Sequence, residues 1–156
     1  MEYKVVIPDE FFSVFKFIQE DNLGVAAINT ALRGFENKVV FGWHLSVMLH
    51  FDNVRKNGLP NENDHKKVED FENSLGNLLN PDSEKPNAVF LGRITWNRTA
   101  ELIWRVHNPE EANNIVQKIL KEKLYPFPFD YRMDPDPDWT LAEWHLKVRE
   151  YEKSDN

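Results

Sequence analysis

Hydrophobic and polar positions change their spacing along the chain, and each change predicts an element of secondary structure. Between residues 41 and 51 apolar and polar side chains alternate, which is the period of a strand with one buried face. Between residues 62 and 79 the apolar spacing becomes three and four, which indicates an amphipathic helix. The strand face comprises Phe41, Trp43, Leu45, Val47, Leu49 and Phe51, and the helical stripe comprises Val68, Phe71, Leu75, Leu78 and Leu79.

Turn and cap residues set the predicted ends of these and other elements. Asn61 is placed to cap the first helix, and Asn80-Pro81 to end it. A second helix has Asn108 as its N-cap, Pro109 at its first position and Glu111 in the capping-box position. Two hairpins are predicted, the first from the apolar runs 11–18 and 25–28, the second from 88–96 and 99–107.

The end of the chain predicts one more strand and one more helix. Residues 127–133 alternate between apolar and polar side chains, with prolines tolerated at the start of the strand. Asp136-Pro137 has the form of a helix cap followed by proline at the first helical position, and Trp139 is expected to anchor that helix to the domain. Its apolar stripe would be Leu141, Trp144, Val148 and Tyr151.

From residue 41 onward the predicted order is βαββαβ, the arrangement of a ferredoxin-like fold with helices on one face of an antiparallel sheet. This core spans about residues 41–134. The N-terminal hairpin and the C-terminal helix are additions that extend the sheet or cover its other face. A chain of 156 residues with 41% hydrophobic content fits a single α+β domain over residues 1–156.

Composition narrows the classes of function. The net charge is -7, and no run of Lys or Arg could neutralise several phosphates, so direct nucleic-acid binding is disfavoured. The chain has no cysteine, which excludes disulfides and thiolate metal sites and fits a reducing compartment. It has neither a leader pattern nor the roughly 20 consecutive apolar residues that span a bilayer, so we expect a cytoplasmic protein that does not bind membranes.

The sequence RMDPDPDW at residues 132–139 resembles the start of a calcium loop, because three carboxylates lie two residues apart. An EF-hand needs Gly at position 6 and Glu at position 12, and counting from Asp134 those positions hold Trp139 and His145. The start of a helix is therefore the better interpretation, with Asp138 in its first turn.

Other motifs give little support for catalysis. His44 and His50 share one strand face but are about 20 Å apart, too far to bind one metal ion. Phosphate-loop, nucleophile-elbow and dinucleotide-binding motifs are absent from the sequence. We therefore expect a non-enzymatic protein without a cofactor or metal.

The second hairpin is predicted to have a polar face. Arg93 and Thr95 are expected to share one face of the hairpin with every second residue of the following strand. This face points away from the apolar side of the hairpin. Such a face either recognises another protein or forms cross-strand ion pairs. The alternate residues of the next strand are Glu101, Ile103, Arg105 and His107.

Several stretches together resemble a bacterial family, domain of unknown function 695, over roughly residues 12–145. They are Asn29-Thr30-Ala31-Leu32, Trp43-His44-Leu45, Gly58-Leu59-Pro60, Gly92-Arg93-Ile94-Thr95-Trp96-Asn97, Pro128-Phe129-Asp130-Tyr131 and Asp136-Pro137-Asp138-Trp139. The resemblance implies a ferredoxin-like fold and no catalytic residues. It also implies a looser similarity in fold to the type B regulator of ribonuclease E activity, an acidic protein that inhibits a ribonuclease by binding it.

These observations favour a small module that binds or regulates another protein, with a nuclease or other basic protein as partner. The alternative is a small-molecule-binding protein or hydrolase with a pocket between the sheet and the added elements. A homodimer through the uncovered sheet face is a further possibility. The residues proposed for an interaction surface are Asp134, Asp136, Asp138, Arg93, Glu101, Arg105 and His44.

Overall fold

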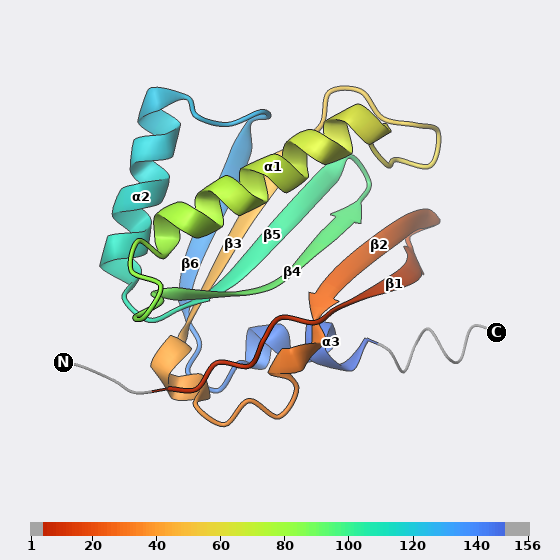
Figure 1. Cartoon of the computed structure of the whole chain (residues 1–156). Helices are drawn as coiled ribbons and strands as arrows, with labels where there is room; N and C mark the ends of the chain where they lie inside the picture. The colour runs from red at the N-terminus through yellow and green to blue at the C-terminus, as the bar shows by residue number, and fades with distance from the viewer. Residues whose placement is uncertain (1–4, 149–156) are drawn as a thin grey trace.

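The computed structural model of the chain describes residues 5–148 and contains a six-stranded antiparallel sheet (Figure 1). Helices α1 and α2 pack on one side of it, which we call the helix face. Short turns and the C-terminal segment pack on the other side, the second face. The elements are β1 (Phe12–Gln19), β2 (Asn22–Asn29), η1 (Thr30–Leu32), η2 (Lys38–Phe41), β3 (Trp43–His50), α1 (Glu62–Leu79), β4 (Ala88–Trp96), β5 (Thr99–Val106), α2 (Pro109–Glu122), β6 (Phe129–Pro135), η3 (Thr140–Ala142) and α3 (Glu143–Lys147).

The order of the strands confirms the ferredoxin-like arrangement. From β3 the elements follow as β3-α1-β4-β5-α2-β6, and the sheet order is β1-β2-β4-β5-β3-β6 with every neighbouring pair antiparallel. The hairpin β1–β2 extends the sheet beyond β4, whereas the C-terminal segment covers part of the second face. The two additions therefore play the two roles that the sequence left open.

The turns and caps lie where the residues predict them. Both hairpins close through two-residue turns with positive φ at each position, Glu20-Asp21 and Asn97-Arg98, which matches the twist of the flanking strands. The side chain of Asn61 accepts a hydrogen bond from the backbone of Asp64 at the start of α1. Asn108 caps α2 in the same way, with Pro109 as the first helical residue.

The main hydrophobic core lies between the helices and the sheet. Leu45, Val47 and Leu49 of β3 are completely buried against the helical stripes, represented by Val68 of α1 and Val116 of α2. Each such side chain contributes about 1.5–3 kcal/mol when it leaves water. The alternation of β3 and the three-four spacing of the helices thus produce the layer that holds the sheet.

Two members of the predicted apolar faces lie elsewhere. Leu78 is 47% exposed, because the stripe of α1 continues through Leu75 to Leu79 instead. Phe41 belongs to the second face, where it packs near Phe35 and Trp139. The cause is the 3-10 turn that ends at Phe41, which interrupts the strand alternation before β3 begins.

A bulge in β4 changes which side chains share a face. Phe90 pairs with Trp104, but Gly92 pairs with Ile103, so the register shifts by one residue. As a result Arg93 lies opposite Leu102 on the helix face. The prediction that Arg93 and Thr95 share a face with Glu101 was therefore wrong, because simple alternation ignores the extra residue.

The C-terminal helix begins later than predicted. Pro137 lies in a turn rather than at a first helical position, and Trp139 has a left-handed backbone with φ of 60° before η3 begins. Within the predicted stripe Leu141 is 46% exposed, and Ala142 and His145 are buried in its place. Tyr151 lies outside the described residues. The anchoring role of Trp139 is confirmed, since this side chain is only 2% exposed.

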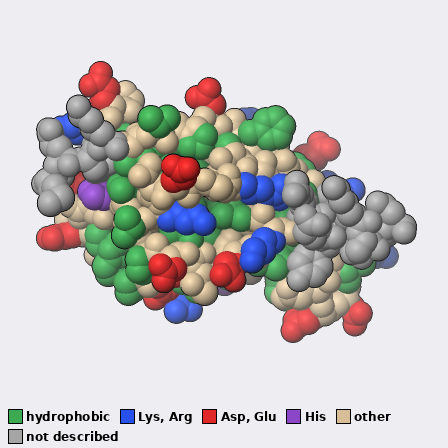
Figure 2. Space-filling model, turned by 90° about the horizontal axis from the view of Figure 1, so that it is seen from below, with side chains coloured by type: hydrophobic (Ala, Val, Ile, Leu, Met, Phe, Trp, Pro, Cys, Tyr) green, Lys and Arg blue, Asp and Glu red, His purple; other side chains and the backbone are tan. Residues whose placement is uncertain are grey.

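Figure 2 views the molecule from the side of the N-terminal segment and α3. Acidic, basic and hydrophobic side chains are interspersed across this face. The net charge of -7 therefore does not gather into one patch there. Among the described residues, no helix has the length and apolar character needed to cross a bilayer.

Candidate functional site

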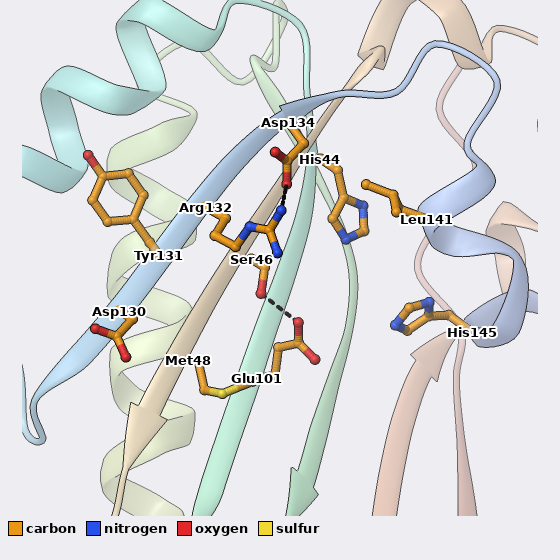
Figure 3. A pocket seen from close by; sticks show the side chains of 10 residues that line it. All are labelled: His44, Ser46, Met48, Glu101, Asp130, Tyr131, Arg132, Asp134, Leu141 and His145. Carbon is orange, nitrogen blue, oxygen red and sulfur yellow. Dashed lines mark hydrogen bonds and ion pairs between the residues drawn. The ribbon is translucent and has the colours of Figure 1, made fainter.

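A cleft of about 430 Å³ lies on the second face, between the sheet and the C-terminal segment (Figure 3). The same alternation that buries Leu45 and Val47 under the helices turns the intervening residues of β3 towards this cleft. Residues of η3 and α3 form the opposite wall. The lining comprises His44, Ser46, Met48, Glu101, Asp130, Tyr131, Arg132, Asp134, Leu141 and His145.

Arg105 holds the C-terminal segment in place behind the cleft. Its side chain is completely buried, and Nη1 lies 2.8 Å from a carboxylate oxygen of Asp136. Nη2 donates to the backbone carbonyl of Asp136, and Nε donates to that of Phe41 at 3.3 Å. The guanidinium carbon lies 4.7 Å from the ring centre of Trp139, a cation–π contact.

The carboxylate of Asp136 also organises the turn that follows it. It accepts hydrogen bonds from the backbone N–H groups of Thr140 at 3.1 Å and Leu141 at 2.9 Å. These bonds and the buried guanidinium hold the pKa of Asp136 below its ordinary value, although burial alone would raise it. Asp136 thus accepts from the first backbone N–H groups of η3, although it is not the residue directly before a helix as predicted, and it also neutralises a buried charge that the sequence did not reveal.

His44 presents a fixed donor to the cleft. Its Nδ1 lies 2.8 Å from Nη1 of Arg105, and because a guanidinium can only donate, Nδ1 must accept. The neutral ring therefore carries its proton on Nε2. Burial and the neighbouring Arg105 lower the pKa of His44 to about 4, so the imidazole is uncharged at neutral pH.

His145 lies across from His44, with ring centres 6.3 Å apart. It is 9% exposed, and among the described residues no group forms a hydrogen bond with its buried Nδ1. Burial and His44 lower the pKa of His145 to about 4, while the backbone of Ala142, which interacts with the ring without meeting hydrogen-bond geometry at Nδ1, acts to raise it. Figure 3 shows this ring pointing from α3 into the cleft.

The remaining charged groups make the cleft negative. Glu101 accepts a hydrogen bond from the hydroxyl of Ser46 at 2.5 Å, and Asp134 lies 3.4 Å from Arg132. Asp130 also lines the cleft, and its carboxylate lies 2.9 Å from Nε2 of His50, a residue outside the lining. Three carboxylates against one guanidinium give the lining a net charge of -2, since both imidazoles of the lining are neutral at pH 7.

The predicted interaction residues do not form one surface. Glu101, Asp134 and His44 line the cleft, whereas Arg105 and Asp136 are buried behind it and could not form an exposed face as predicted. Arg105 is buried because the C-terminal segment, through Asp136 and Trp139, covers the end of β5.

The other two predicted residues lie apart from the cleft. Asp138 is exposed in a separate depression beside Trp139. Arg93 lies on the helix face and bonds to Glu72 at 2.6 Å, with Glu69 at 3.8 Å. Burial is the main reason that the pKa of Glu72 is raised despite this pair.

The geometry of the cleft differs from that of a hydrolase triad. Ser46 donates to Glu101, and His44 uses Nδ1 to accept from Arg105, so neither histidine nitrogen is shown activating the hydroxyl. Within residues 5–148 no three His, Asp or Glu side chains converge closely enough to hold a metal ion. The arrangement is instead suited to holding a ligand group by charge and hydrogen bonds.

Sequence reasoning missed most of the residues that line this site: Ser46, Met48, Asp130, Tyr131, Arg132, Leu141 and His145. A signal for part of it was present, because the polar positions of β3 alternate with its buried ones. The approach of His145 to His44 joins residues 101 positions apart and has no local signature.

Comparison with known proteins identifies one family. No curated protein and no solved structure matches the chain. A family model described as a family of unknown function, DUF695, matches residues 13–144, which cover β1 to the start of α3. The chain therefore belongs to the family of unknown function DUF695.

Proposed function

We propose that the protein is a non-enzymatic binding module that recognises a basic segment of a partner protein through the cleft beside His44. The observation that carries this proposal is the net negative lining around uncharged imidazoles. A Lys or Arg side chain of the partner would lie between the carboxylates of Glu101 and Asp134. Because the cleft is partly desolvated, such charge complementarity contributes more there than on an open surface.

Apolar groups at the rim support a peptide rather than a free cation as the ligand. Leu141 is 46% exposed beside the cleft, and Met48 forms part of its floor. Flexible Met side chains adapt to different apolar partners. A basic residue flanked by an aliphatic one would therefore match the lining better than a polyamine.

A regulatory role is the finer form of this proposal. A nuclease is the partner that this form of the proposal names, because the family resemblance implies a looser similarity in fold to the type B regulator of ribonuclease E activity. Nucleases carry basic surfaces for their substrate, and an acidic module could compete for such a surface. The charge of the cleft carries this form of the proposal, because function depends on the site rather than on the fold.

The test measures binding of labelled peptides that contain one Arg or Lys flanked by Leu, by fluorescence anisotropy. The variant combines Glu101→Gln, Asp130→Asn and Asp134→Asn. A control combines neutral substitutions of exposed acids elsewhere, Glu36→Gln, Asp52→Asn and Glu122→Gln. Both variants change the net charge equally, from -7 to -4.

We expect the cleft variant to lose about tenfold in affinity and the control to lose about twofold. Added salt should weaken binding by the wild-type chain. Equal losses in the two variants would show that only overall charge matters. Absence of binding to every basic peptide would also contradict the proposal.

A small-molecule ligand is the second candidate, and two observations favour it. The cleft volume of about 430 Å³ lies in the range of ligand pockets, and the Nε2–H of His44 is a preorganised donor for a carbonyl or carboxylate. Small zwitterions would satisfy both this donor and the carboxylates. Stabilisation of the chain against heat by amino acids, lost in the cleft variant, would favour this candidate over the peptide.

A further inference from the structure

The two edges of the sheet differ in how they are protected. At one edge, β6 ends in Pro135, follows Pro128 and carries Asp130 and Arg132 among its residues. Proline and charge are the usual means of preventing a further strand from pairing with an edge. At the other edge, β1 has the sequence FSVFKFIQ, with no proline and with Lys16 as its one charged residue.

The backbone register identifies which groups of β1 point outward. Thr30 N–H donates to the carbonyl of Phe11 at 2.9 Å, so Phe11 directs its backbone groups towards the chain of β2. In an antiparallel ladder this direction alternates from residue to residue. The residues whose N–H and C=O groups face the open edge are therefore Phe12, Val14, Lys16 and Ile18.

The side chains of these outward residues are unusually exposed for apolar groups. Phe12 is 41% exposed, Val14 59% and Ile18 76%. They lie on the helix face of the hairpin, and Figure 1 shows β1 and β2 lying beyond the part of the sheet that α1 and α2 cover. Of the described strands, β2 alone pairs with β1. Open backbone groups and exposed apolar side chains thus occur on the same residues.

We propose that this edge pairs with β1 of a second copy of the chain, forming a two-fold symmetric dimer with one continuous sheet. The four outward residues are symmetric about Phe15. An axis at Phe15 places Phe12 opposite Ile18 of the second copy and Val14 opposite Lys16 of the second copy. All four residues then exchange hydrogen bonds, and no outward group of the strand is left without a partner.

Charge favours the register with its axis at Phe15 over the register with its axis at Lys16. An axis at Lys16 would place the two Lys16 ammonium groups directly opposite each other, which is unfavourable in a cross-strand pair. In the register about Phe15, the aliphatic stem of Lys16 covers Val14 of the second copy, and its charged end reaches water. The dimer edge differs from the sheet face that the sequence suggested, since short turns and α3 cover much of that face.

Acidic residues just beyond the strand limit the strength of this dimer. If the pairing continues past the strand ends, Glu10 lies opposite Glu20 of the second copy, and the axis generates this contact twice. Like charges in this position repel. The association should therefore be concentration-dependent and should strengthen as salt screens the repulsion.

The experiment measures the molar mass of the full chain by light scattering and its association constant by sedimentation equilibrium, at low salt and at about 0.5 M NaCl. A charge variant, Glu20→Lys, would turn each repulsive contact into an ion pair. We expect the association constant to rise about threefold to tenfold. Glu36→Lys makes the same change in net charge at an exposed position away from β1 and should have a much smaller effect.

A backbone variant tests the edge directly. Val14→Pro removes an outward N–H while leaving the hydrogen bonds between β1 and β2 in place, so it should abolish the dimer. Circular dichroism and urea unfolding establish whether this variant folds. If it does not fold, the response to Glu20→Lys still decides the proposal.

Three results would overturn the proposal. One is a wild-type chain that stays monomeric at the highest attainable concentration in about 0.5 M NaCl. Another is a dimer whose association constant is unchanged in a folded Val14→Pro variant. The third is an equal response to Glu20→Lys and Glu36→Lys.

Discussion

The two faces of strand β3 are held in place by different kinds of interaction. On the helix face, Leu45, Val47 and Leu49 are completely buried among apolar side chains, where shape and volume matter. On the second face, a buried guanidinium, Arg105, joins the sheet to the C-terminal segment through Asp136. The first interaction is non-directional and shared among many residues, while the second depends on a few groups in one geometry. The cleft lies on the second face, beside the pair formed by Arg105 and Asp136.

Removal of Trp139 should have the largest effect on the second face. Its ring packs near Phe35, and its indole N–H lies within hydrogen-bond distance of the carbonyls of Lys38 at 2.8 Å and Phe41 at 3.0 Å. We expect Trp139→Ala to lower the free energy of unfolding by about 3–5 kcal/mol. Urea denaturation provides the measurement.

Trp144 offers a matched control for this change, because it is only partly buried and contacts Phe17 edge-on. Trp144→Ala should cost less than Trp139→Ala. Equal costs would mean that the anchor is distributed along the whole segment rather than centred on Trp139.

A nearly isosteric change should separate the two faces more sharply. Asp136→Asn keeps the side-chain volume but leaves the buried charge of Arg105 without its carboxylate, so we expect a loss of about 3 kcal/mol. Leu45→Met keeps the volume on the helix face and should cost less than about 1.5 kcal/mol. The free energies of unfolding of the two variants can be compared in urea. If Asp136→Asn costs no more than Leu45→Met, the second face tolerates a volume-conserving substitution as well as the helix face does.

The sequence predicted the helix face well because its information is local. Alternation in β3, the stripe of α1 and the cap residues Asn61 and Asn108 each act within a few positions. The topology then follows from the order of strands and helices. This part of the fold required no knowledge of contacts distant in sequence.

The second face was predicted less well for identifiable reasons. A bulge near Leu91 reversed the face of Arg93, and a 3-10 turn moved Phe41 away from the strand pattern. Arg105 occupied a position typical of an exposed strand residue, and its buried charge is neutralised by the carboxylate of Asp136, 31 residues later. Such pairing depends on three-dimensional contact and leaves no spacing to read.

Acidification should weaken the second face first. The pKa of His44 and that of His145 are both lowered to about 4 from the ordinary 6.5, so each folded ring stays neutral where the unfolded chain binds a proton. The stability that this contributes is complete above pH 6.5 and is lost as the pH falls towards 4. The expected slope is about 1.4 kcal/mol per pH unit for each histidine.

Unfolding in urea between pH 7.5 and pH 4 would measure this slope. The raised pKa of Glu72 acts in the opposite direction, because its buried charge is removed as the pH falls. The slope should become smaller in His145→Leu, which keeps only one of the two rings. A slope unchanged by that substitution would contradict the assignment to these histidines.

The same substitution should have a smaller effect at neutral pH. His145→Leu removes a buried Nδ1 for which the described residues provide no hydrogen bond, and it retains an apolar side chain against the sheet. We expect the free energy of unfolding to rise by about 1 kcal/mol. A loss of stability would show that the ring makes a contact through Nδ1 that contributes to the fold.

Calcium should have the smallest effect of all, although residues 134–138 resemble the start of a calcium loop. The carboxylate of Asp136 already binds Arg105 and two backbone N–H groups, and Asp138 lies in a different depression from Asp134. The three carboxylates therefore do not converge on one ion, whose oxygen ligands would have to lie about 2.3–2.6 Å away from it. The melting temperature should be the same with millimolar calcium and with chelator, and Asp138→Asn should leave this comparison unchanged. A calcium-dependent rise in melting temperature that Asp138→Asn abolishes would mean that the segment can release Arg105 and close around a metal, which would remove the distinction between the two faces.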